Sequence, residues 1–167
     1  MFKLDTPTEN DIREKFPKPS DAIQGMVDGL LTMENNPHFE INMTSFGEWA
    51  MEDGVRIKPE QICPTDRICF GCAATATVYG AFHLDPQKVD PRDVYDVLEE
   101  FEKAIDILRL GITNRLLNWY NVPTNLIHKV NVQRLTLNLH WEMDTDTWKE
   151  HIPTLLRFKT ILLELEL

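Results

Sequence analysis

The feature that most constrains the fold is a run of seventeen residues, from Ile68 to Leu84, that contains no Asp, Glu, Lys or Arg. Across the whole chain, by contrast, 26% of the residues are charged. A helix that faces water keeps a polar side, so a segment without charges has to be covered on every side. The run therefore predicts a buried segment at the centre of the fold.

Spacing within this run favours a helix. Residues three and four apart share a helix face, so Cys72, Ala76 and Gly80 form one ridge of small side chains that lets a neighbouring helix approach closely. A strand is the alternative, because residues 74–82 are rich in Thr, Val and aromatic side chains. Each of the two glycines also lowers helix propensity by roughly 1 kcal/mol. We predict a central helix over residues 68–84.

Length and charge bound the class of protein. The 167 residues are enough for one globular domain, 1–167, with residues 1–19 as a polar N-terminal arm. The net charge of −10 argues against nucleic-acid partners and against an anionic membrane surface. Since the first twenty residues hold no apolar run, we expect no signal peptide and a cytoplasmic protein with reduced cysteines.

Hydrophobic periodicity predicts a mainly α fold, with α+β as the alternative: a helical bundle around the buried central helix. Helices expected over 20–33 and 91–110 pack against the centre, and shorter helices are expected at 45–54, which includes Trp49, and at 113–120. Alternating residues indicate strands at 38–43 and 135–143. The second strand predicts a small antiparallel sheet near the C-terminus, which residues 163–167 could join.

The three cysteines are candidates for a metal or redox site. Cys63, Cys69 and Cys72 follow the spacing C-x5-C-x2-C, but a tetrahedral zinc site needs a fourth ligand. Cys69 and Cys72 also form a CxxC at an expected helix start, where a thiol pKa falls. The alternative is that both are small buried core residues. We favour the core role and expect no metal and no cofactor.

Acidic residues recur every third position from Asp90 to Glu102. Within them, Glu99-Glu100-Phe101-Glu102 contains an ExxE that resembles the metal-binding motif of the all-helical, magnesium-dependent nucleotide pyrophosphatases. The resemblance implies a nucleotide hydrolase that uses the acidic helix 90–106. The sequence departs from that family because it lacks the second ExxD motif that completes the metal site. A solvated helix face is the simpler interpretation.

The window from Ile107 to Trp141 contains no acid. Its weak interaction candidates are Arg115, Trp119, Tyr120 and Trp141. The chain has no Gly-rich phosphate loop, GxSxG or HExxH motif, so no catalytic set is assigned. The leucine-rich C-terminal segments exceed what one domain readily buries. The sequence therefore favours a non-enzymatic interaction or regulatory protein that forms a homo-oligomer or binds another protein.

Overall fold

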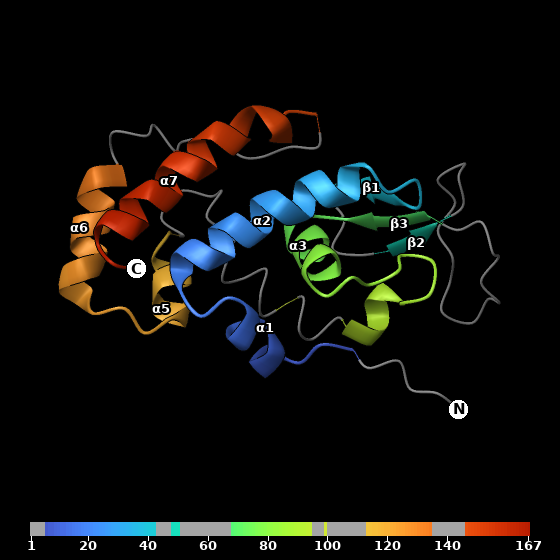
Figure 1. Ribbon diagram of the computed structural model, residues 1–167, viewed down its shortest axis with the longest axis horizontal. Helices are drawn as coiled ribbons and strands as arrows, with labels where there is room; N and C mark the ends of the chain where they lie inside the picture. The colour runs from blue at the N-terminus through green and yellow to red at the C-terminus, as the bar shows by residue number, and fades with distance from the viewer. Residues whose placement is uncertain (1–5, 43–47, 51–67, 95–98, 100–112, 135–145) are drawn as a thin grey trace.

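The computed structural model describes residues 6–42, 48–50, 68–94, 99, 113–134 and 146–167. With η marking 3-10 helices, the elements in chain order are α1 (Glu9–Lys15), α2 (Pro19–Glu34), β1 (Phe39–Ile41), β2 (Glu48–Ala50), β3 (Ile68–Gly71), α3 (Ala73–Ala81), η1 (Pro91–Val94), α5 (Thr113–Trp119), α6 (Thr124–Arg134), η3 (Trp148–His151) and α7 (Ile152–Glu164). Figure 1 shows α2 crossing the middle of the molecule, with the small sheet at one end and α5 and α6 at the other. This mainly helical architecture confirms the predicted fold class.

The middle of the uncharged segment is buried, as predicted, but residues 80–84 are only partly covered, and His83 is exposed. The segment is also two elements. Its first four residues form β3, and α3 begins only at Ala73, with Cys72 as its N-cap. Every residue from Gly71 to Tyr79 is buried. The prediction of one helix over 68–84 was therefore wrong for the first turn. The reason is tertiary, because β3 lies between two other strands and forms its hydrogen bonds with them.

The sheet has the order β1-β3-β2. β1 pairs with β3 in parallel, with Phe39 opposite Cys69, and β2 pairs with β3 antiparallel, with Trp49 opposite the same Cys69. The strand predicted at 38–43 is confirmed as β1. The helix predicted around Trp49 was wrong, because that residue lies on β2.

The described sheet also differs from the predicted sheet in its position in the chain and in its strand direction. It lies in the first half of the chain and includes a parallel pair, whereas an antiparallel sheet was expected near the C-terminus. The strand predicted at 135–143 falls outside the described residues. β2 and β3 have only three and four residues, too few for alternation to stand out in the sequence.

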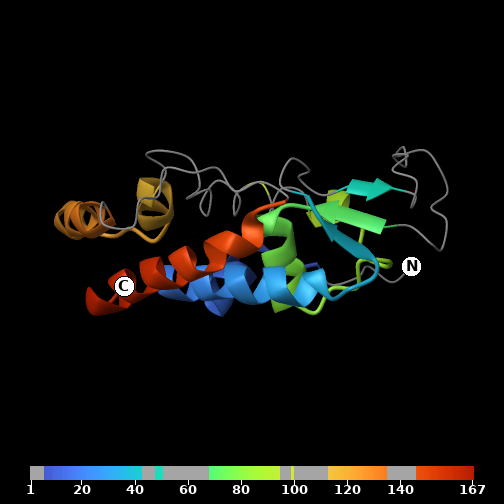
Figure 2. The same ribbon diagram turned by 90° about the horizontal axis from the view of Figure 1, so that it is seen from above.

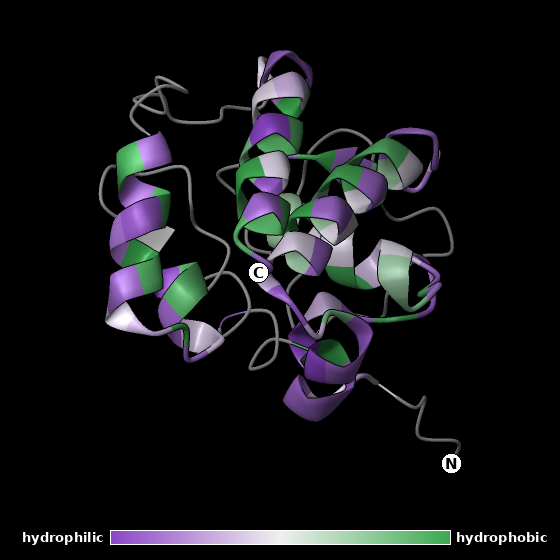
Figure 3. Ribbon diagram, turned by 60° about the vertical axis from the view of Figure 1, so that its left-hand side comes forward, coloured by the Kyte–Doolittle hydropathy of each residue, from purple (hydrophilic) through white to green (hydrophobic). Residues whose placement is uncertain are grey.

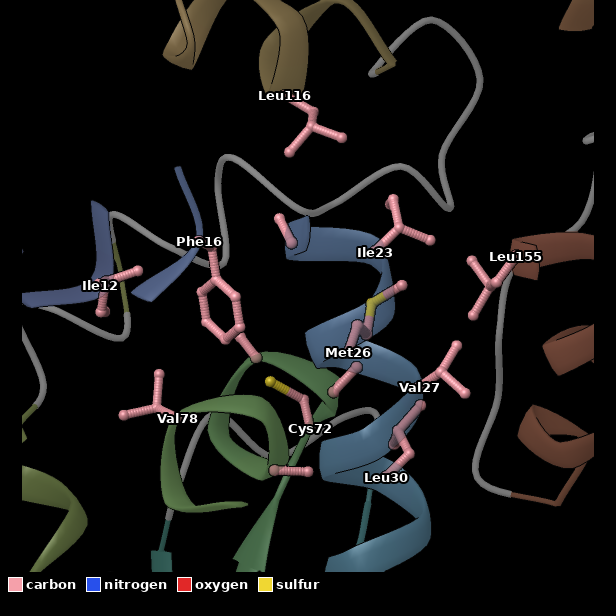
Figure 4. Close-up of a cluster of buried hydrophobic side chains, with 14 of the residues drawn as sticks. Ile12, Phe16, Ile23, Met26, Val27, Leu30, Cys72, Val78, Leu116 and Leu155 are labelled. Atoms are coloured by element: carbon pink, nitrogen blue, oxygen red, sulfur yellow. The ribbon is translucent and has the colours of Figure 1, made fainter. Parts of the chain in front are cut away.

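The core forms where α2 packs against α3, which is the most extensive contact between the elements that the structure describes. Figure 4 shows Met26 and Leu30 of α2 beside Cys72 of α3, with Leu155 of α7 reaching Val27 from the other side. The predicted packing of residues 20–33 against the centre is confirmed. Of the second predicted partner, 91–110, the structure describes η1 and Glu99, and the remainder is outside the described residues.

α7 runs antiparallel to α2. Lys159 Nζ donates to Gln24 Oε1 at 2.7 Å, and Lys149 forms an ion pair with Glu34 at the other end of α2. Figures 1 and 2 show the two helices side by side. Beyond α7 the chain turns, and the N–H of Leu167 donates to the Leu162 carbonyl at 2.8 Å. Residues 163–167 therefore end a helix and do not pair as a strand.

The N-terminal region begins with a capped helix. Thr8 caps α1 in a reciprocal capping box with Asp11, and the accepted hydrogen bonds lower the pKa of the Asp11 carboxyl. Figure 3 shows that α1 is mostly hydrophilic. Its buried residue is Ile12, and Ile12 and Phe16 at its C-terminal end are both in the core. The segment expected as a polar arm thus packs through two apolar side chains.

Candidate functional site

The two described thiols lie in the core. Cys69 is on β3 and Cys72 is at the start of α3, and both are free and buried. Desolvation by burial raises the pKa of the Cys69 thiol to about 12, while a hydrogen bond with Tyr79 opposes part of that shift. The thiolate is the form that attacks and that binds metal, so Cys69 is held in its unreactive, protonated form at neutral pH.

Cys69 and Tyr79 belong to a small buried polar cluster. The Tyr79 hydroxyl donates to the Val89 carbonyl at 2.9 Å, and burial raises the pKa of the phenol far above its ordinary value. Cys72 Sγ lies 3.8 Å from Thr75 Oγ1 in the first turn of α3. These contacts join β3, α3 and the loop before η1. The cluster is therefore suited to holding three elements together.

The metal candidates are only partly placed. Cys63 lies outside the described residues, so the structure does not bring the three cysteines together or separate them. Within the described ranges, no group of three or more His, Cys, Asp or Glu residues is positioned to hold a metal ion. The metal and redox assignments remain predictions from the spacing alone.

The acidic segment is likewise described only at its start. Asp90 forms an ion pair with Arg92, and Asp93 is exposed on η1. The expected helix start at Asp90-Pro91 is observed as a 3-10 turn. Glu99 is half-buried, while the rest of the ExxE lies outside the described residues. The hydrolase alternative stays a prediction.

Two of the four interaction candidates contact α1 and its C-terminal end. The Arg13 guanidinium lies 3.7 Å from the centre of the Trp119 ring and donates to the Trp119 carbonyl at 2.9 Å. The Tyr120 hydroxyl donates to the Phe16 carbonyl at 2.7 Å, and burial raises the pKa of this phenol. These contacts dock α5 onto the N-terminal segment.

The other two candidates differ in what the structure shows. Arg115 is exposed on α5, and Trp141 lies outside the described residues. The structure therefore describes only part of the predicted interaction surface. Within that part, Trp119 and Tyr120 contact other residues of the same chain. The sequence could not show this, because Arg13 is more than a hundred residues away.

A shallow cleft of about 480 Å³ opens where α2 ends, lined by Thr32, Asn35, Asn36, His38, Leu84 and Gln87 among others. His38 Nδ1 and Gln87 Nε2 are 3.1 Å apart across it. Asn36 Oδ1 accepts from the His38 N–H and Asp85 Oδ1 from the Gln87 N–H, both at 2.9 Å. The polar groups that line the cleft hold two turns together by these hydrogen bonds. We therefore assign no catalytic or binding role to the cleft.

Exposed leucines gather on α2 and α7. Leu31, Leu156 and Leu163 are 41%, 39% and 53% exposed, and the other large exposed apolar residue of the described chain is Val132 on α6. The register of α2 against α7 brings Leu31 alongside the first turn of α7. Sequence analysis pointed to leucine-rich C-terminal segments in general. The signal it missed is the seven-residue spacing of Leu156 and Leu163.

The chain gave no match to a family model, to a curated protein or to a solved structure. Among the described residues, no helix is long and apolar enough to cross a membrane. The site assignments therefore depend on the geometry alone.

Proposed function

We propose that the protein is a non-enzymatic interaction or regulatory protein that self-associates. The observation that carries this proposal is the group of three exposed leucines on the antiparallel pair of helices α2 and α7. Isolated exposed leucines are ordinary, but Leu156 and Leu163 share one face of α7 by their seven-residue spacing, and apolar residues that gather on one face mark interaction surfaces. Covering that face in a complex removes apolar surface from water, which is favourable.

The state of the thiols supports the non-enzymatic part of the proposal. Cys69 is buried with a raised pKa, so it is a poor nucleophile and a poor metal ligand at neutral pH. Trp119 and Tyr120 are engaged with Arg13 and Phe16. The exposed leucines are thus the best-supported candidates for contact with a partner, together with Arg115.

Sedimentation velocity and native mass spectrometry over a wide range of protein concentrations test the proposal. The expected result is a reversible rise in average mass above that of one chain as the concentration increases. A chain that stays monomeric throughout contradicts self-association. Mg²⁺-dependent nucleotide hydrolysis that Glu99→Gln abolishes contradicts the non-enzymatic assignment, and stoichiometric zinc in the purified protein would instead support the metal-binding alternative.

A further inference from the structure

The exposed leucines of α7 lie on a single helix face. Leu156 and Leu163 are seven residues apart, which is close to two full turns, so their side chains project in nearly the same direction. Thr160 lies between them, and its hydroxyl donates to the Leu156 carbonyl at 3.0 Å, so it is satisfied within the helix. Leu155, Phe158 and Leu162 are buried on the opposite side. We call the exposed stripe of Leu156, Thr160 and Leu163 the α7 face.

Two charged residues flank the α7 face. Arg157 and Glu164 are also seven residues apart, so they lie on one edge of the stripe, and both are exposed. In the described part of the chain neither of them forms an ion pair. The stripe thus carries one positive and one negative charge on the same edge, separated by two helical turns.

We infer that α7 pairs with the α7 of a second copy of this chain, antiparallel across a twofold axis near Thr160. This inference rests on the proposed self-association and names the surface that carries it. In this arrangement Leu156 of each copy packs opposite Leu163 of the other copy. The small Thr160 near the axis lets the two helices approach closely.

The charge pattern selects the antiparallel orientation. About the same axis, Arg157 of each copy lies beside Glu164 of the other, so two favourable pairs form at once. In a parallel pair the twofold axis would run along the helices, so the edge with Arg157 and Glu164 in one copy would lie on the opposite side of the interface from the same edge in the other copy. Neither charged pair could then form, so the antiparallel orientation is favoured.

The interface is small. α7 has 13 residues and is about 20 Å long at 1.5 Å per residue, which is less than a standard protein interface spans. We therefore expect a reversible dimer with a dissociation constant in the micromolar range.

A reciprocal charge exchange tests the orientation by sedimentation equilibrium of the full chain. Arg157→Glu and Glu164→Arg are each expected to weaken the dimer roughly tenfold, because each variant places like charges together twice. The double variant R157E/E164R restores complementary pairs and is expected to return the dissociation constant to near that of the parent. Single variants with unchanged affinity, or a double variant as weak as the singles, would overturn the inference.

Matched apolar substitutions test the surface. Leu163→Gln and Leu156→Gln are each expected to weaken the dimer at least tenfold, since each removes two packed leucines across the axis. Val132→Gln on α6 is the control, because Val132 is 54% exposed and Leu163 is 53% exposed. Circular dichroism and thermal melting verify that all three variants remain folded.

The outcomes separate this inference from the proposed function. If the parent chain associates but Val132→Gln weakens it while Leu163→Gln does not, the α7 pairing is overturned and self-association stands. If the parent chain is monomeric at every concentration, both are overturned. Loss of association in the α7 variants together with rescue by the charge exchange supports both.

Discussion

Gly29 on α2 and Gly80 on α3 meet where the two helices cross, and a β-carbon built on Gly80 would lie 3.0 Å from the Gly29 α-carbon. A β-carbon on Gly29 would lie 2.5 Å from the Thr77 α-carbon and 2.7 Å from the Ala76 carbonyl oxygen. The backbones of the two helices are thus in direct contact. The ridge of small residues predicted for the central segment is what permits this close approach.

Gly29→Ala is expected to destabilise the protein by about 2–3 kcal/mol, although alanine is the better helix former. The methyl group would meet backbone atoms of α3, which cannot rotate away as a side chain can. Gly80→Ala, with its nearest contact at 3.0 Å, should cost less. Urea denaturation measures both, with Thr32→Ala at an exposed position of α2 as the control. Equal stability of Gly29→Ala and the parent would contradict the contact.

Cys69 is expected to make the stability fall at alkaline pH. Its pKa is about 12 when folded, against an ordinary value of 9.0. The stabilisation that comes from the raised pKa of this thiol is complete below pH 9. It is lost as the pH rises toward 12, because the thiol of the unfolded chain releases its proton at a lower pH. The loss from this thiol is about 1 kcal/mol between pH 9 and pH 10.

Urea denaturation across that pH range checks this expectation. Cys69→Ala removes the titrating group and should give a flatter dependence of unfolding free energy on pH, even if it is less stable at neutral pH. Tyr79 is present in both proteins, and because burial is the largest cause of its raised pKa, most of its own titration is common to the two curves. Parallel curves for the parent and the variant would show that Cys69 is not held protonated.

Tyr79→Phe is expected to cost about 1–2 kcal/mol of unfolding free energy, because it leaves the Val89 carbonyl without its 2.9 Å hydrogen bond in the core. Tyr120→Phe deletes a comparable bond, to the Phe16 carbonyl, in a half-buried position. Water can reach that carbonyl more readily, so the cost should be smaller. Chemical denaturation measures the loss of unfolding free energy in both variants. A larger loss for Tyr120→Phe than for Tyr79→Phe would contradict the prediction.

Arg13→Gln is expected to loosen α5 from α1 and to destabilise the protein by about 1 kcal/mol, through loss of the contact with the Trp119 ring and carbonyl. The Trp119 indole resonance should shift in an NMR spectrum. Glu9→Gln is the control, since it removes only the partly exposed pair with Arg13 and should cost less than about 0.5 kcal/mol. Equal effects of the two variants would mean that the Trp119 contact contributes nothing.

Much of the fold follows from local patterns. The absence of charge from 68 to 84 correctly located the buried centre, and helical spacing correctly located α2 and α5. The cap of α1 is local as well, because the Thr8 side chain satisfies a free N–H three residues away. These features depend on residues close together in the chain, which is why the sequence reveals them.

The sheet and the contacts of the candidate site could not be predicted from such local patterns. β3 lies in the run that was predicted to be one helix, but it forms a strand because β1 and β2 supply hydrogen bonds on both sides. Trp119 was a candidate for contact with partners, and the contact of its ring with Arg13 could not be foreseen from the sequence. Both outcomes depend on contacts between segments that are far apart in the sequence.

The sequence alone determined that the middle of this chain is buried, finely packed and free of charge, because no other environment suits seventeen residues without a charged side chain. Tertiary structure decided where strand gives way to helix inside that segment, which aromatic residues are engaged, and which leucines stay in water. The physical reason is that local spacing fixes the face a residue occupies on its own element. Only the packing of one element on another determines whether that face is covered.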